Sequence, residues 1–149
     1  VGAQFAMPGA IERLREARDA PREADIVAMA ACDPANPWGA ALPWPGTLSG
    51  LRGPRREAGA TVVLIDGVPW VWISKSGRAV CTFPDLHQCD DPGLINAALE
   101  AAVESHPRLP ISVEKVNDEA ALDSPCIENF LSIGFYRDLR GVRYERKAR

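Results

Sequence analysis

The chain has 149 residues, of which 46% are hydrophobic and 25% charged, and its formal net charge is -3. This length and composition predict one globular domain that is large enough to bury a core. The acidic balance argues against a dedicated nucleic-acid-binding module, which is usually basic overall, but it leaves room for local basic patches. No apolar run approaches the length of a membrane span, so we expect no membrane partner.

Cysteine usage and the first residues bear on where the protein works. The four cysteines form no Cys-x-x-Cys pair, and a chain of this size needs no disulfide framework, which favours reduced thiols in a cytoplasmic protein. The chain starts at Val1 with neither an initiator methionine nor a signal peptide. We therefore expect a fragment of a longer protein.

A helix is predicted near the N-terminus, over residues 8–18. Ile11 and Leu14 fall on one face of it, and a proline stands at its first position. We interpret residues 1–24 as a helical lead-in and residues 25–149 as an α+β body within a single domain.

The segment at residues 33–45, Asp-Pro-Ala-Asn-Pro-Trp-Gly-Ala-Ala-Leu-Pro-Trp-Pro, is called the Pro/Trp loop here. Its four prolines exclude a helix interior and a central strand. Two tryptophans and a leucine carry too much apolar surface for a flexible linker, so an ordered clamp over a sheet is favoured over a ligand pocket. The residues assigned to this structural role are Asp33, Pro34, Asn36, Pro37, Trp38 and Trp44.

An antiparallel β-meander is the clearest structural signal in the chain. Residues 25–32 fit a buried strand or a short helix, and their length and the Asp33-Pro34 stop favour the strand. Three more strands follow over residues 60–65, 68–74 and 78–83. Asp66-Gly67 has the composition of a two-residue hairpin turn between the first two of these three.

The middle strand of the meander is apolar on both sides. Trp70 and Trp72 are two residues apart and are expected to share one face, with Val71 and Ile73 on the other. Each face of the sheet must therefore be covered by another part of the protein.

The second half predicts helix, strand, helix and strand in succession. Asp91 is a helix N-cap, residues 109–116 have strand character, residues 124–133 form a helix, and residues 136–147 fit a β-ribbon. With the meander, the fold class is α+β: an antiparallel meander sheet with about three packed helices and a strand-helix-strand-helix-strand second half.

The sequence lacks the common catalytic and metal-binding motifs. It contains no nucleotide phosphate loop, no Gly-x-Gly-x-x-Gly and no helicase-type Asp-Glu box, so no ATP hydrolysis or other catalysis is assigned to this chain. Cys81, His87, Cys89 and Cys126 match no zinc module, and core packing is favoured over a metal site. An acyltransferase interpretation lacks the glycine-rich pyrophosphate loop that it needs.

Arginines gather in two places, at residues 52–56 and in the tail at residues 137–149. On one side of the molecule they would contact phosphates, and nearby tryptophans could stack on an unpaired base. A solvated surface and a protein interface are the alternatives. The candidate nucleic-acid contacts are Arg52, Arg55, Arg56, Arg140, Arg143 and Arg146.

Three stretches, residues 2–15, 33–45 and 58–67, resemble the extreme C-terminal region of bacterial Lhr-type, large helicase-related proteins. Weaker similarity continues over residues 113–117 and at Gly134-Phe135, so the likeness covers nearly the whole chain. The Pro/Trp loop is its most specific part.

This resemblance implies a terminal accessory domain of a superfamily 2, ATP-dependent 3′-to-5′ DNA helicase associated with DNA repair. ATP and Mg²⁺ would then serve a motor elsewhere in the parent, with no cofactor in this chain. The implied partners are the rest of the parent, further copies in a homo-oligomer, and DNA, in the bacterial cytoplasm near the nucleoid. No catalytic residue carries over. The alternative is a DNA-base-processing, glycosylase-like domain with a base pocket between Trp38, Trp44 and a buried carboxylate.

Overall fold

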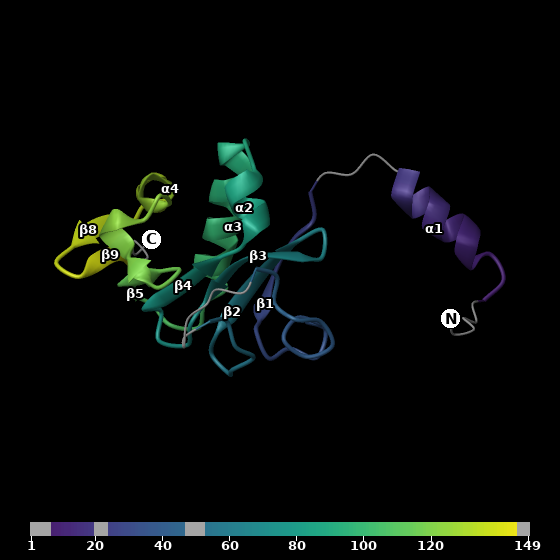
Figure 1. The fold of residues 1–149 in the computed structure, drawn as a ribbon, viewed down its shortest axis with the longest axis horizontal. Coiled ribbons are helices and arrows are strands. Elements are labelled where there is room, and N and C mark those ends of the chain that lie inside the picture. The colour runs from purple at the N-terminus through teal and green to yellow at the C-terminus, as the bar shows by residue number, and fades with distance from the viewer. Residues whose placement is uncertain (1–6, 20–23, 47–52, 146–149) are drawn as a thin grey trace.

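The computed structural model describes residues 7–19, 24–46 and 53–145. It confirms the α+β class, with helices packed beside two sheets (Figure 1). The helices are α1 (Ala10–Asp19), α2 (Pro84–Gln88), α3 (Pro92–Glu104) and α4 (Ile127–Ser132), with a short 3-10 helix at Ala121–Asp123.

The larger sheet has six strands in the order β1-β2-β3-β4-β6-β7. These are β1 (Ile26–Ala30), β2 (Thr61–Ile65), β3 (Val68–Ile73), β4 (Ala79–Thr82), β6 (Lys115–Val116) and β7 (Glu119–Ala120). The smaller sheet has the order β5-β9-β8, with β5 at Ile111–Val113, β8 at Tyr136–Asp138 and β9 at Gly141–Tyr144.

Strands β1 to β4 pair antiparallel and confirm the predicted meander. The turn between β2 and β3 follows its sequence signal, because Asp66 and Gly67 both have positive φ, at 51° and 82°. The parallel pairing of β4 with β6 then brings the second half of the chain into the same sheet.

The predicted faces of the middle strand are wrong at Trp70. Val63 pairs with Val71 but Leu64 pairs with Pro69, which leaves Trp70 as an extra residue in β3. This bulge shifts the alternation of side chains by one position. Trp70 therefore joins one core cluster, whereas Trp72 lies in the cluster on the opposite face.

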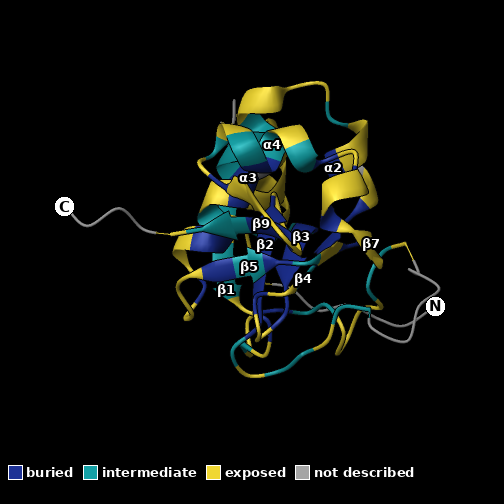
Figure 2. Cartoon of the chain, turned by 90° about the vertical axis from the view of Figure 1, so that its left-hand side faces the viewer, coloured by how far each residue is buried: buried dark blue, intermediate teal, exposed yellow. Residues whose placement is uncertain are grey.

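Helix α3 covers the first face of the large sheet (Figure 1). It starts as the sequence predicts, because the Asp91 carboxylate accepts hydrogen bonds from the amides of Gly93, at 2.9 Å, and Leu94, at 3.3 Å. The buried positions of the helix follow its apolar stripe and are Ala98, Leu99, Ala102 and Val103. Figure 2 shows the buried residues gathered on the strands between the helices and the opposite loops.

The single strand predicted over residues 109–116 is wrong. The chain changes sheets at Glu114, so β5 pairs with β9 whereas β6 pairs with β4. The amides of Glu114 and Lys115 both donate to the carbonyl of Arg78, at 2.8 and 3.0 Å, which fixes this crossing. Long-range pairing of this kind leaves no mark on local alternation.

Three short elements were missed, and one of them is the three-residue 3-10 helix Ala121–Asp123. Helix α2 has only five residues, too few to show helical periodicity. The β6-β7 hairpin turns at Asn117 and Asp118, whose positive φ values of 51° and 66° are those of a tight turn built without glycine.

Helix α1 lies apart from the sheets in Figure 1. It forms, but it begins at Ala10 and not at the predicted Pro8, because Gly9 has a positive φ of 81°. Ile11 and Leu14 on its apolar face are 59% and 71% exposed. None of the helices in the described parts of the chain has the length and apolarity that a membrane span requires. The proposed division at residue 24 stays a prediction.

Candidate functional site

The Pro/Trp loop lies over the second face of the large sheet. Its backbone is held from within, because the buried side chain of Asn36 donates to the carbonyl of Ala31 at 2.8 Å and accepts from the amide of Trp38 at 3.1 Å. The Asp33 carboxylate accepts from the amide of Ala35 at 2.8 Å, which closes the turn that Pro34 opens.

The two tryptophans of this loop face the sheet. Trp38 Nε1 donates to the carbonyl of Gly67 at 2.9 Å, and the ring of Trp44 stacks on Phe83 with centroids 5.8 Å apart. Both pack against the core cluster that contains Trp72. The loop therefore covers the face that α3 leaves open, and both indoles contact protein there.

Arg56 joins this loop to the segment before β2. Its guanidinium donates to the carbonyls of Asn36, Asp33 at 3.1 Å, and Trp38 and Cys32, both at 3.4 Å. Four backbone acceptors on one side chain hold the loop against the body. The Arg56 donors thus point at the loop, although the sequence suggested a phosphate contact.

The other arginines expected to contact nucleic acid are spread over the molecule. Arg52 and Arg146 lie outside the described residues. Arg143 Nε is 2.8 Å from a Glu145 carboxylate oxygen, and this bond raises the pKa of the guanidinium. Arg55 and Arg140 are exposed, and each lines a hollow. Their predicted role in binding DNA stays a prediction.

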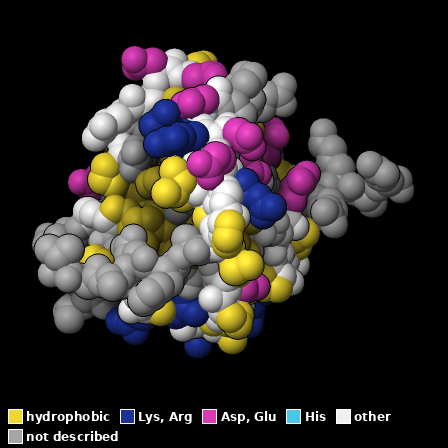
Figure 3. Space-filling model, turned by 90° about the vertical axis from the view of Figure 1, so that its right-hand side faces the viewer, with side chains coloured by type: hydrophobic (Ala, Val, Ile, Leu, Met, Phe, Trp, Pro, Cys, Tyr) yellow, Lys and Arg dark blue, Asp and Glu magenta, His cyan; other side chains and the backbone are white. Residues whose placement is uncertain are grey.

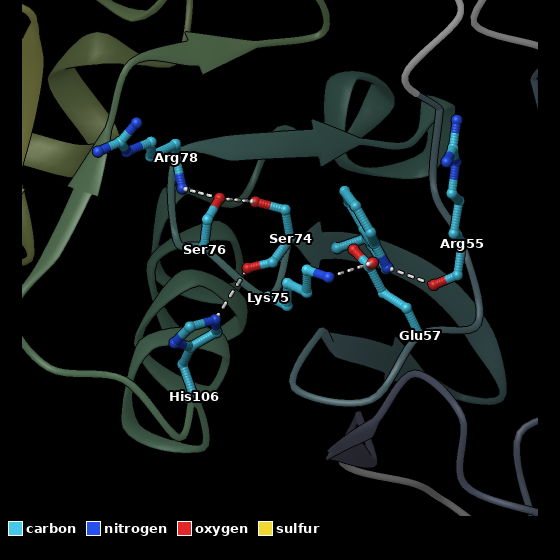
Figure 4. Close-up of polar contacts among 8 residues, drawn as sticks. Arg55, Glu57, Ser74, Lys75, Ser76, Arg78 and His106 are labelled. Atoms are coloured by element: carbon cyan, nitrogen blue, oxygen red, sulfur yellow. Dashed lines mark hydrogen bonds and ion pairs between the residues drawn. The ribbon is translucent and has the colours of Figure 1, made fainter.

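Two neighbouring hollows form a groove that runs from Arg55 to Arg140. Figure 4 shows polar side chains near the point where the two hollows meet, among them Ser76 and Arg78. The first has a volume of about 460 Å³ and the second about 380 Å³. They share Ser76, Arg78 and Glu114, so the two spaces adjoin at the turn between β3 and β4.

Charges of both signs line this groove. The cationic side chains are Arg55, Arg78, Arg108, Lys115 and Arg140, and the anionic ones are Glu57, Glu114, Asp118 and Asp138. Arg78 Nε is 3.7 Å from a Glu114 oxygen, and Lys75 pairs with Glu57 at 3.9 Å beside the first hollow. The described lining of the groove is therefore nearly neutral, with three cationic and three anionic residues around the first hollow and three cationic and two anionic residues around the second.

Sequence reasoning missed Arg78, Arg108 and Lys115. They are dispersed in the chain, and none of them belongs to a local cluster of arginines. Only the crossing of the chain between the two sheets brings their segments together.

The thiols behave as core side chains where they are buried. Burial, with a smaller contribution from Asp118, raises the pKa of Cys81 to about 12. Burial also raises the pKa of Cys126, against the opposing hydrogen bonds of Ser124 and Thr82. In the parts of the chain that the structure describes, no three His, Cys, Asp or Glu residues gather closely enough to hold a metal ion.

Both histidines have structural partners. His106 is 4% exposed, and its Nε2 donates to the carbonyl of Ser74 at 3.0 Å while its Nδ1 accepts from the amide of Arg108 at 3.2 Å. His87 Nε2 lies 2.8 Å from the Thr82 hydroxyl, to which the Asn117 amide also donates, at 2.7 Å. These contacts connect turns to strands.

The glycosylase alternative requires a base pocket beside Trp44. A hollow of about 400 Å³ lies there. The described residues that line it carry no ionisable side chain; they are Gly39, Ala40, Leu42, Pro43, Trp44, Gly46 and Pro54. It offers an apolar surface without a general acid or base.

Comparison with known proteins adds a family to this geometry. The chain is 36% identical over 156 aligned positions to a protein of Mycolicibacterium smegmatis named "Lhr helicase/ probable uracil glycosylase". It is 34% identical over 144 positions to the "Lhr helicase/uracil glycosylase" of Escherichia coli. No family model matches the chain.

Both alignments cover 95% of this chain but only 10% and 9% of the two relatives. The chain therefore spans about a tenth of the length of the curated relatives that it matches. It is a piece of an Lhr-type helicase.

Proposed function

We propose that this chain is a non-catalytic accessory domain from the C-terminal end of an Lhr-type, ATP-dependent DNA helicase. It docks through α1 onto the rest of that helicase, whose motor holds the ATP and Mg²⁺ elsewhere in the parent, in the bacterial cytoplasm. The observation that carries this proposal is the exposed apolar face of α1, on which Ile11 and Leu14 are 59% and 71% exposed.

A helix like α1 needs a partner. It has ten residues, and isolated helices shorter than about 12 to 15 residues are only marginally stable in water. Ile11 and Leu14 are three positions apart, so their side chains lie on one face. Met7, at 81% exposed, extends the uncovered apolar surface just before the helix. A surface laid over this face would stabilise the helix and bury these side chains.

The body does not need α1 to complete its core. Helix α3 covers one face of the large sheet and the Pro/Trp loop covers the other. Seen from the α1 side, the molecule carries hydrophobic side chains interspersed with charges of both signs (Figure 3). Non-obligate interfaces have about the same overall composition as the rest of a protein surface, so this mixture is compatible with docking but does not by itself mark an interface. Since the relatives are about ten times longer than this chain, the rest of the parent is the partner that we assign to α1.

A base-excision role receives no comparable support from this chain. The relatives carry uracil glycosylase in their names. The indoles of Trp38 and Trp44 pack on the sheet, however, and the hollow beside Trp44 is lined by no carboxylate among the described residues. The docking function is therefore the one that we put forward.

The test is made in the full-length helicase with Ile11→Glu and Leu14→Glu together. Arg13→Glu is the matched control, because it changes the charge of the same helix by the same two units. Sedimentation velocity measures compactness and mass. The proposal expects the double variant alone to sediment more slowly, either at unchanged mass, when α1 docks within one subunit, or as smaller assemblies, when it docks on a neighbouring subunit of an oligomer. Unchanged sedimentation of the double variant would refute the docking role.

A further inference from the structure

The second hollow of the groove is lined by arginines from three separate segments, and we call it the three-arginine hollow. Arg78 precedes β4, Arg108 lies between α3 and β5, and Arg140 lies at the tip of the β8-β9 hairpin. The Ser76 and Ser112 side chains also line it. All three arginines are exposed, so their guanidinium groups remain accessible to a ligand.

The carboxylates of this hollow are already engaged. Glu114 lies 3.7 Å from Arg78 Nε, and Asp138 accepts from the amide of Leu139 at 2.7 Å. Among the residues that the structure describes, neither Arg108 nor Arg140 has a carboxylate oxygen within 4.0 Å of its guanidinium. Two guanidinium groups thus line one hollow without an ion pair of their own, and the Asp138 carboxylate is the further anionic group among the described lining residues.

The backbone that presents Arg108 and Arg78 is fixed by buried contacts. His106 accepts a hydrogen bond from the amide of Arg108 and donates one to the carbonyl of Ser74, so the Arg108 segment is tied to the turn between β3 and β4. Figure 4 shows the bond between His106 and Ser74. The carbonyl of Arg78 accepts the amides of Glu114 and Lys115 on the far side of that turn. The hollow therefore has a preorganised frame, which lowers the entropy lost on binding.

The hairpin that carries Arg140 is held as firmly. A Cβ added to Gly141 would lie 1.9 Å from the carbonyl oxygen of Val113, so β9 and β5 approach each other at this point to a distance that only glycine permits. Leu139 stands beside Arg140 at the hairpin tip and is 98% exposed. The hairpin tip therefore presents the Leu139 side chain next to the Arg140 guanidinium, which has no ion pair among the described residues.

We infer that the three-arginine hollow binds the phosphates of a single nucleic-acid strand, with Leu139 packed against the face of an adjacent base. The guanidinium fork matches phosphate oxygens in a bidentate manner, and apolar side chains at such tips can insert between bases. The adjoining hollow continues the groove toward Arg55, which suits a polymer better than a free anion. In a duplex, insertion of a side chain such as Leu139 requires the bases to unstack, which costs free energy. An unpaired base presents its face without that cost, so we expect a single strand to be favoured over a duplex.

The near-neutral groove and the net charge of -3 set the expected strength. We expect affinities in the range of non-specific binding, about 1 to 100 µM, with strong dependence on salt. Each phosphate contact to a single strand adds about 0.7 to the slope of log affinity against log salt. Arg108 and Arg140 together should therefore contribute about 1.4 to that slope.

The test uses this chain and a fluorescein-labelled oligothymidylate of about 15 nucleotides, with fluorescence anisotropy read at several salt concentrations. Arg108→Ala with Arg140→Ala should weaken binding roughly tenfold or more and flatten the slope by about 1.4. The matched control, Arg13→Ala with Arg137→Ala, removes the same charge away from the hollow and should leave the slope unchanged.

Substitutions of Leu139 test the contribution of base stacking to binding separately from the contribution of charge. Leu139→Ala should weaken binding about threefold to tenfold at every salt concentration without altering the slope, and Leu139→Phe should restore it. Equal losses in the hollow and control variants, or absent binding at low salt, would overturn the inference. So would an oligoglutamate peptide that binds through Arg108 and Arg140 while the oligonucleotide does not, because the hollow would then recognise an acidic protein segment. None of these outcomes bears on α1, which lies outside the hollow.

Discussion

Helices α1 and α3 have the same kind of apolar stripe but opposite surroundings. In α3 the stripe is buried against β1, β2 and β3, and Leu99 is 1% exposed. In α1 the stripe is uncovered, and Leu14 is 71% exposed. A sequence pattern thus fixes which face of a helix is apolar, whereas the covering partner is set by the rest of the fold or by another protein.

The same contrast separates the body from α1. Each face of the large sheet is covered, one by α3 and the other by the Pro/Trp loop, which Arg56 holds through four carbonyls. Buried apolar area stabilises a domain by about 25 cal/mol per Å², so the covered body should fold by itself. The exposed apolar side chains of helix α1 gain no such stabilisation from burial within the described parts of this chain.

The largest effect is expected from one substitution made in both helices. Leu99→Ala leaves a cavity under α3 and should lower the free energy of unfolding by about 2 to 5 kcal/mol. Leu14→Ala removes the same atoms from an exposed site and should change it by less than about 0.5 kcal/mol. Urea denaturation followed by tryptophan fluorescence measures both. Similar losses at the two positions would show that α1 packs on the body.

A smaller effect is expected from uncovering the other face of the sheet. Arg56→Ala leaves loop carbonyls without their donor and should cost about 1 to 3 kcal/mol of stability. The buried thiol of Cys81 reports the loop's position, because it lies in the cluster that the loop covers and burial raises its pKa to about 12.

Alkylation kinetics at Cys81 make that report measurable. Raising the pKa from 9.0 to about 12 leaves about a thousandfold less thiolate well below pH 9 than an ordinary thiol holds. In the wild type, Cys81 should therefore react very slowly, at a rate that climbs about tenfold per pH unit. Arg56→Ala should accelerate the reaction and Arg55→Ala should not. Equal rates in the Arg56 variant and the wild type would mean that the loop stays closed without this arginine.

The smallest effect concerns where α3 begins. Asp91→Ala removes the acceptor for the amides of Gly93 and Leu94 and should cost about 1 kcal/mol, whereas Asp91→Asn keeps the cap and should cost less. Thermal unfolding monitored by circular dichroism distinguishes the two variants. Equal melting temperatures for the Ala variant and the wild type would show that the cap contributes nothing measurable.

Local signals in the sequence predicted much of the fold. The Asp66-Gly67 turn, the Asp91 cap and the end of the last helix at Gly134, with φ of 100°, all depend on residues near one another in the chain. Such signals are encoded in a few consecutive side chains and survive in the folded state. They place the meander and the helices.

Features that depend on distant pairing were not predictable in the same way. The bulge at Trp70 arises from the register with β2, and the change of sheet at Glu114 arises from β4 and β9. The groove follows from those crossings. Sequence reasoning found Arg55 and Arg140 within clusters but missed Arg78 and Arg108, because nothing near them in the chain shows that they meet.

Hydrogen exchange along α1, compared between this chain and the full-length helicase, tests the docking proposal most directly. Because a ten-residue helix without cover opens readily, its amides should exchange almost without protection in this chain. In the full-length protein, docking should slow exchange over residues 11–18 by at least about tenfold, while α3 stays protected in both. Equally fast exchange of α1 in the two proteins would contradict docking through this helix.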